Sequence, residues 1–208
     1  MQRFRGAQRG AASRAGFTLL EGIIALSLFA VLAVNLTVLT RATQQGTGQE
    51  DQLMQLEVLA TQTLDRLVLA LMAAQQEAVV PLKPAPLNDS QIAYTISNGV
   101  DQNGDLVWSD PESVGLDIGS DKVIWRRNPD TEAELRVVWG RHVATAALGE
   151  ALGNAKDDNG DGLVDEYGLS FHLAPNGTSV VIQLSLARQT DSGVWIRTSS
   201  RQRVAFRN

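Results

Sequence analysis

Residues 17–39 read FTLLEGIIALSLFAVLAVNLTVL, and this stretch decides how the chain is organised. It contains no Lys or Arg, and Glu21 is its only charged residue. A helix needs about 20 mostly apolar residues to cross a hydrocarbon core of roughly 30 Å. The stretch therefore predicts a transmembrane helix.

The charges on either side of this stretch predict its orientation. Four arginines and no acidic residue precede it: Arg3, Arg5, Arg9 and Arg14. Glu50 and Asp51 follow it. Because cytoplasmic flanks of membrane helices are enriched in basic residues, we expect a cytoplasmic N-terminus and a body on the other side of the membrane.

The composition excludes several classes of function. The 208 residues carry 18 basic and 23 acidic side chains, and a net charge of −5 disfavours nucleic acid as a partner. The chain has no cysteine and two histidines, which excludes thiolate chemistry and disulfides and disfavours a His-rich metal site. No nucleotide-binding loop, hydrolase elbow or metalloprotease motif is present, so we expect no enzyme.

The next stretch, residues 44–80, has the pattern of an amphipathic helix. Two glycines within residues 44–48 predict a bend or a short melted segment at its start. Apolar residues then recur every three to four places and form a stripe that packs on another surface: Leu53, Leu56, Leu59 or Ala60, Leu64, Leu67, Leu71 and Ala74. Pro81 ends the helix. Residues 81–208 show short alternating runs separated by Asn-Gly turns, which predict antiparallel strands and an α+β fold.

One carboxylate inside the apolar stretch calls for a functional explanation. A charged side chain in a membrane costs about 2.5 kcal/mol or more. Glu21 stands five residues after Gly16, in the sequence RAG-FTLLEGIIAL. The basic leader, Gly16, Phe17 and Glu21 in this register resemble the class III prepilin signal of type IV pilins and type II secretion pseudopilins.

This resemblance assigns roles to three residues. It implies that prepilin peptidase removes a leader of residues 1–16 by cutting between Gly16 and Phe17, and then methylates the new amine of Phe17. It also implies that Glu21 guides assembly by pairing with the terminal amine of a neighbouring subunit, because a buried carboxylate is tolerable when a cation reaches it.

The resemblance also implies an architecture and a setting. Residues 17–43 would form the membrane and filament-core helix, residues 44–80 the amphipathic helix of the head, and residues 81–208 a β-rich periplasmic head domain. The expected fold is pilin-like, with a long N-terminal helix packed on an antiparallel sheet. The implied partners are other pilin-like subunits, prepilin peptidase, an inner-membrane assembly platform and membrane lipid.

Two interpretations of the whole chain remain open. A large head without cysteines favours a non-enzymatic minor subunit of a type II secretion pseudopilus or type IV pilus, most similar to the J-type minor pseudopilins and acting at initiation or at the tip. The alternative is a signal-anchored periplasmic calcium-binding module that does not polymerise. The alternative gives no reason for glycine, phenylalanine and glutamate in register.

An acidic segment at residues 156–168, KDDNGDGLVDEYG, predicts a calcium loop. Its D-x-N-x-D-G opening places oxygen ligands at alternate positions before a glycine that allows a sharp turn. The expected ligands are Asp157, Asn159, Asp161, the Leu163 carbonyl, Asp165 and Glu166. The twelfth position, where a helix–loop–helix hand has an acid, is Gly168. The other interpretation is a solvated acidic turn without a cation.

Overall fold

The computed structural model describes residues 18–190 and 192–206 and, within them, all side chains except those of residues 41–47. The chain divides into two compact units, Met1–Gly48 and Gln49–Asn208. One helix, α1 (Leu19–Met72), contributes its first part to one unit and its second part to the other. We call the second unit the head.

In the first unit, α1 has the length and composition of a membrane span. The segment Leu19–Thr40 has 22 residues and a mean hydropathy of 2.4, and none of it is buried. The sequence also predicts a bend or a melted segment at residues 44–48, but α1 stays helical through these residues, so the melted segment is wrong. Two glycines cost about 1 kcal/mol each, and cooperative hydrogen bonding within a long helix tolerates that cost.

Helix α1 ends at Met72, before the predicted end at residue 80. The following residues include the short 3₁₀ helix η1 (Gln76–Ala78) and two isolated bridges, Ala74 with Ile96 and Val80 with Ala93. The backbone N–H of Val80 donates to the Ala93 carbonyl at 2.9 Å. Pairing with the sheet region therefore satisfies backbone groups that a longer helix would satisfy internally.

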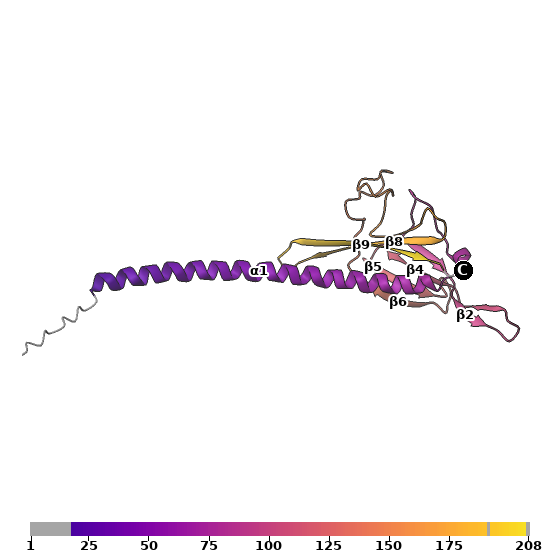
Figure 1. The fold of residues 1–208 in the computed structure, drawn as a ribbon, viewed down its shortest axis with the longest axis horizontal. Helices are drawn as coiled ribbons and strands as arrows, with labels where there is room; N and C mark the ends of the chain where they lie inside the picture. The colour runs from indigo at the N-terminus through magenta and orange to yellow at the C-terminus, as the bar shows by residue number, and fades with distance from the viewer. Residues whose placement is uncertain (1–17, 191, 207–208) are drawn as a thin grey trace, which may run out of the picture. The chain divides into compact units, whose positions relative to one another are not determined.

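The strands of the head form two antiparallel sheets and one hairpin (Figure 1). The larger sheet has the order β1 (Gln91–Tyr94), β4 (Glu112–Asp117), β5 (Lys122–Arg127) and β6 (Leu135–Gly140). The smaller sheet has the order β7 (Leu169–Leu173), β8 (Ser179–Gln189) and β9 (Trp195–Ala205). Strands β2 (Ser97–Val100) and β3 (Leu106–Trp108) pair only with each other among the described strands.

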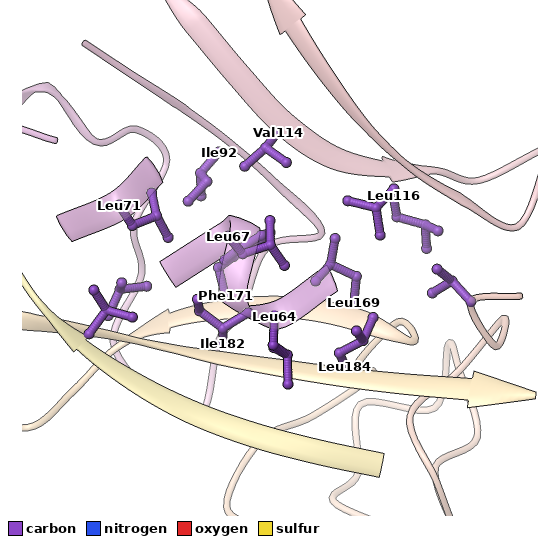
Figure 2. Close-up of a cluster of buried hydrophobic side chains, with 14 of the residues drawn as sticks. Leu64, Leu67, Leu71, Ile92, Val114, Leu116, Leu169, Phe171, Ile182 and Leu184 are labelled. Atoms are coloured by element: carbon purple, nitrogen blue, oxygen red, sulfur yellow. The ribbon is translucent and has the colours of Figure 1, made fainter. Parts of the chain in front are cut away.

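The apolar stripe of α1 is the centre of the head core. Leu64, Leu67 and Leu71 lie among side chains from both sheets, including Val114 of β4 and Phe171 of β7 (Figure 2). Most of the predicted stripe is buried: Leu56, Ala60, Leu64, Leu67, Leu71 and Ala74. Each fully buried leucine contributes about 1.5–3 kcal/mol, so this stripe fixes the helix against both sheets. The predicted α+β class is confirmed.

Candidate functional site

The first candidate site is the start of α1, where Thr18 and Glu21 form a capping box. Glu21 Oε2 accepts hydrogen bonds from the backbone N–H and from the hydroxyl of Thr18, both at 3.0 Å. The backbone N–H of Glu21 donates to Thr18 Oγ1 at 3.3 Å. This reciprocal pattern satisfies N–H groups that a helix leaves unpaired at its first turn. Glu21 thus has a local role in starting the helix, besides any role between subunits.

The predicted cleavage and methylation residues, Gly16 and Phe17, lie outside the described residues. The described part begins at Thr18, and α1 begins at Leu19. The helix that follows exposes every large apolar side chain between Leu19 and Leu39, with exposed fractions from 50% at Ile24 to 84% at Leu19. An apolar surface of this extent is typical of a segment that lies in lipid or against other apolar helices.

The second candidate site is the acidic loop, whose opening residues organise the turn. Asp157 Oδ1 accepts hydrogen bonds from the N–H groups of Gly160 at 2.6 Å and Asp161 at 3.1 Å, and its Oδ2 accepts one from Gly162 at 2.9 Å. Asn159 Oδ1 also accepts from the N–H of Asp161, at 2.9 Å. Gly162 has a φ of +93°, so a glycine is needed at this turn.

Two further carboxylates hold the base of the loop together. Asp165 Oδ1 accepts from the N–H groups of Gly153 and Asn154 at 2.6 and 2.9 Å, and its Oδ2 accepts from Ala155 at 3.0 Å. Glu150 binds the N–H of Asp165 at 3.0 Å and that of Asp158 at 3.2 Å. Glu150 is absent from the predicted ligand set. Its sequence context, ALGEALG, carries no signal that it belongs to this loop.

The absent acid at the twelfth position has a steric explanation. A side chain at position 168 would collide with the backbone of Ala144, because the Cβ atom of any other residue would overlap the Ala144 carbonyl. The carbonyl of Gly168 accepts a hydrogen bond from the N–H of Ser185 at 2.6 Å. The end of the loop therefore lies directly against strand β8. A glycine at position 168 allows the backbone there to pass close to the backbone of Ala144.

Glu166 differs from the other acidic residues of the loop because it is fully buried. Its exposed fraction is 0%, and among the described residues neither carboxyl oxygen has a hydrogen-bond partner. Burial, followed by the neighbouring Asp161 carboxyl, raises the pKa of Glu166 to about 8, and the charge of Glu150 acts in the same direction. A buried carboxyl group without a partner is costly, so this position needs a proton or a cation.

Asp161 connects the loop to strand β8. Its Oδ1 accepts from the N–H of Leu163 at 3.1 Å, and its Oδ2 accepts from Nε2 of Gln183 at 2.9 Å. Burial acts to raise the pKa of Asp161, but the adjacent Glu166 carboxyl and the Gln183 amide leave it lowered. The pKa values of the two neighbouring carboxyl groups are therefore shifted in opposite directions, lowered at Asp161 and raised at Glu166.

The sheet surface beneath the loop is polar, and Ser170, His172 and Gln183 on it are buried, whereas Arg201 is exposed. Ser170 of β7, Gln183 of β8 and Arg201 of β9 stand in one row across the three strands. Arg201 Nη2 lies 3.2 Å from Nε2 of His172, and burial, followed by the charge of Arg201, lowers the pKa of His172. Among the described residues, Ser170 Oγ, His172 Nδ1 and Gln183 Oε1 are buried without a hydrogen-bond partner.

The predicted calcium ligands are thus only partly brought together. Asp157, Asn159 and Asp165 direct oxygens to backbone N–H groups, Leu163 is buried, and Asp161 adjoins Glu166. Across the described ranges, no group of three or more His, Cys, Asp or Glu side chains is arranged to hold a metal ion. The residues that fit a hard cation best are the Asp161–Glu166 pair and the free amide oxygen of Gln183, all oxygen donors.

Comparison with known proteins bears on the N-terminal site. Residues 12–34 match the family model described as the prokaryotic N-terminal methylation motif. No curated protein and no solved structure matches the chain. The matched range contains Gly16, Phe17 and Glu21. The resemblance to the class III signal of type IV pilin-like proteins is confirmed, and the chain carries the N-terminal motif of pilins and pseudopilins that prepilin peptidase processes.

Proposed function

We propose that this chain is a non-enzymatic minor subunit of a pilin-like filament, either a type II secretion pseudopilus or a type IV pilus. The observation that carries the proposal is the methylation motif at residues 12–34, followed directly by the exposed apolar helix Leu19–Thr40. A separate head with its own core follows. Motif, apolar helix and independently packed head are the three parts that a filament subunit of this class needs.

The first step of the proposed mechanism is processing. Prepilin peptidase hydrolyses the amide between Gly16 and Phe17, so that the leader leaves with a carboxylate and Phe17 gains an amine. Transfer of one methyl group from a methyl donor to this amine releases a proton. The new terminal amine then stands four residues before Glu21 in the sequence, where it can pair with a carboxylate of the same or a neighbouring subunit.

The capping box supports a two-part role for Glu21. Cleavage before Phe17 leaves Thr18 and Glu21 intact, so the helix keeps its start in the mature chain. Both hydrogen bonds from Thr18 go to Oε2 of Glu21. The same carboxylate carries the charge that a terminal amine of another subunit would neutralise in an apolar filament core.

The proposed setting follows from the two units. Before assembly, the span Leu19–Thr40 crosses the inner membrane with the N-terminus in the cytoplasm, and the head folds in the periplasm. Other pilin-like subunits then replace lipid around the apolar helix, driven by an inner-membrane assembly platform. The cysteine-free head favours a minor subunit of the J-type at the start or tip of the filament. The acidic net charge of −5 gives no support to a nucleic-acid partner.

The intact mass and N-terminal sequence of the protein from native membranes test this proposal. We expect a chain that starts at Phe17 and carries one added methyl group. A matched sample from a host without prepilin peptidase should retain residues 1–16. A chain that keeps its leader in a host with a working peptidase would contradict the proposal and favour a signal-anchored module that does not polymerise.

A further inference from the structure

We propose that a divalent cation binds beneath the acidic loop of the head, between Asp161, Glu166 and the side-chain carbonyl of Gln183. This site lies on the outer face of the β7–β8–β9 sheet, in a different unit from the apolar helix. It differs from the D-x-N-x-D arrangement in the sequence, because one of its ligands comes from strand β8.

The first observation is the free oxygen of Gln183. This residue lies within β8 and is 7% exposed. Its Nε2 donates to Asp161 Oδ2 at 2.9 Å, while among the described residues its Oε1 is buried without a partner. A buried amide oxygen ordinarily has a hydrogen-bond partner, so the unpaired oxygen on a side chain already bonded to Asp161 points to a ligand at this place.

The second observation is the carboxyl group of Glu166, which comes from the far end of the same loop. It is fully buried, it adjoins Asp161, and neither of its oxygens is paired within the described part of the chain. Leaving a buried polar atom unpaired costs about 1–3 kcal/mol, and more if the group is charged. One cation between Glu166, Asp161 and Gln183 would satisfy three unpaired oxygens and neutralise two carboxylates together.

The donor types favour calcium among the divalent cations. All three groups are oxygen donors, and calcium accepts six to eight oxygen ligands in flexible geometry. Two carboxylates and one amide supply up to five oxygens, and water completes the shell where the loop is open: Asn159 and Asp161 are only partly buried. Structural zinc sites are built mainly from Cys and His ligands, and the chain has no cysteine.

The bound cation would fasten the loop to the sheet. Besides the bond between Asp161 and Gln183, the carbonyl of Gly168 joins the loop to the sheet by accepting from the N–H of Ser185. The loop also concentrates negative charge, with Asp157, Asp158 and Asp165 near the pair. A divalent cation therefore reduces repulsion within the loop and holds its base on β8.

Calcium binding to the full-length chain in detergent micelles, measured by titration calorimetry after chelation, tests the proposal. We expect one calcium per wild-type chain and at least tenfold weaker binding in Gln183→Met, which keeps the length of the side chain but removes the amide oxygen. The matched control is Gln189→Met on the same strand, whose Nε2 donates to the Gly193 carbonyl outside the loop. It should bind calcium as the wild type does.

A second variant keeps the test decisive if Gln183→Met folds poorly. Glu166→Gln preserves shape and removes the charge, so it should lose calcium binding and also lose the calcium-dependent rise in Tm. Wild-type protein that binds no calcium would overturn the proposal, as would equal affinity in Gln183→Met and Gln189→Met. Neither result depends on processing or filament assembly. A failure of the calcium proposal would therefore leave the proposed filament role untouched, and the reverse also holds.

Discussion

Leu32 and Leu67 lie on the same helix, yet the exposed fraction of Leu32 is 66% and that of Leu67 is 0%. Residues 22–40, around Leu32, contain no charged side chain. Polar residues separate the apolar ones before Leu67, while residues 67–74, LVLALMAA, are apolar throughout. A helix that is apolar all round requires lipid or other apolar helices, and a striped helix requires one covering surface. Leu67 is buried because both sheets cover its face of α1, whereas Leu69, two places on, stays 68% exposed.

The strongest test of this comparison is truncation within the stripe. Leu67→Ala should lower the free energy of unfolding of the head by about 2–5 kcal/mol, because it leaves a cavity between the sheets. Urea unfolding followed by tryptophan fluorescence measures this loss. The control is Leu69→Ala, at a position that is 68% exposed, with an expected change below about 0.5 kcal/mol. Equal losses in the two variants would contradict the assigned stripe.

Membrane retention of the apolar segment Leu19–Thr40 should be weakened by an introduced charge but not by shortening one apolar side chain. Leu28→Arg should reduce membrane retention by a free energy of about 2.5–3.5 kcal/mol, while the head keeps its urea midpoint. Alkaline extraction of membranes, with Leu28→Ala as the control, measures retention. If both variants stay in the membrane to the same extent, Leu28 does not lie near the centre of a membrane span.

A third prediction extends the comparison to acidic side chains, since Glu166 is as buried as Leu67. In the folded, cation-free protein the pKa of Glu166 is raised to about 8, from a usual value of 4.5. The unfolded chain therefore releases this proton first, and the stability of the head falls as pH rises between these values, by at most about 1.4 kcal/mol per pH unit.

Urea midpoints measured in chelator between pH 5 and pH 8 test this slope. In Glu166→Gln the contribution of this residue should vanish, so the variant should gain stability over the wild type as the pH increases. A wild-type profile parallel to that of the variant would show that Glu166 titrates alike in the folded and unfolded chains.

The smallest expected effect concerns the start of the apolar helix. Glu21→Gln retains an oxygen that can cap Thr18 but removes the charge, whereas Glu21→Ala removes both. Loss of the cap costs about 0.5–2 kcal/mol locally. If the charge of Glu21 guides assembly, chemical cross-linking should join both variants to filament subunits less often than it joins the wild type. The head should stay folded in both. If Glu21→Gln is incorporated into filaments normally while Glu21→Ala is not, the role of Glu21 is limited to capping the helix.

The sequence was least informative about β4 and the loop base. Strand β4 lies between β1 and β5, yet its sequence, ESVGLD, has only two large apolar residues, Val114 and Leu116, separated by a glycine. Its glycine is required by packing, because a Cβ at Gly115 would lie 2.5 Å from Cβ of Gln91. Similarly, Glu150 and Gln183 join the acidic loop through contacts that span 15 and 22 residues of sequence. Local patterns carry no record of such contacts.

The sequence by itself determined the apolar helix, the stripe that follows it, the methylation motif and the α+β class. Each depends on spacing within a few residues, and periodicity reports which faces of a helix or strand avoid water. Only the tertiary structure decided that Glu166 is buried, that Asp161 meets Gln183 of β8, and that position 168 admits no side chain. Those features arise where distant segments meet, and their energies depend on desolvation and close packing, which exist only in the folded chain.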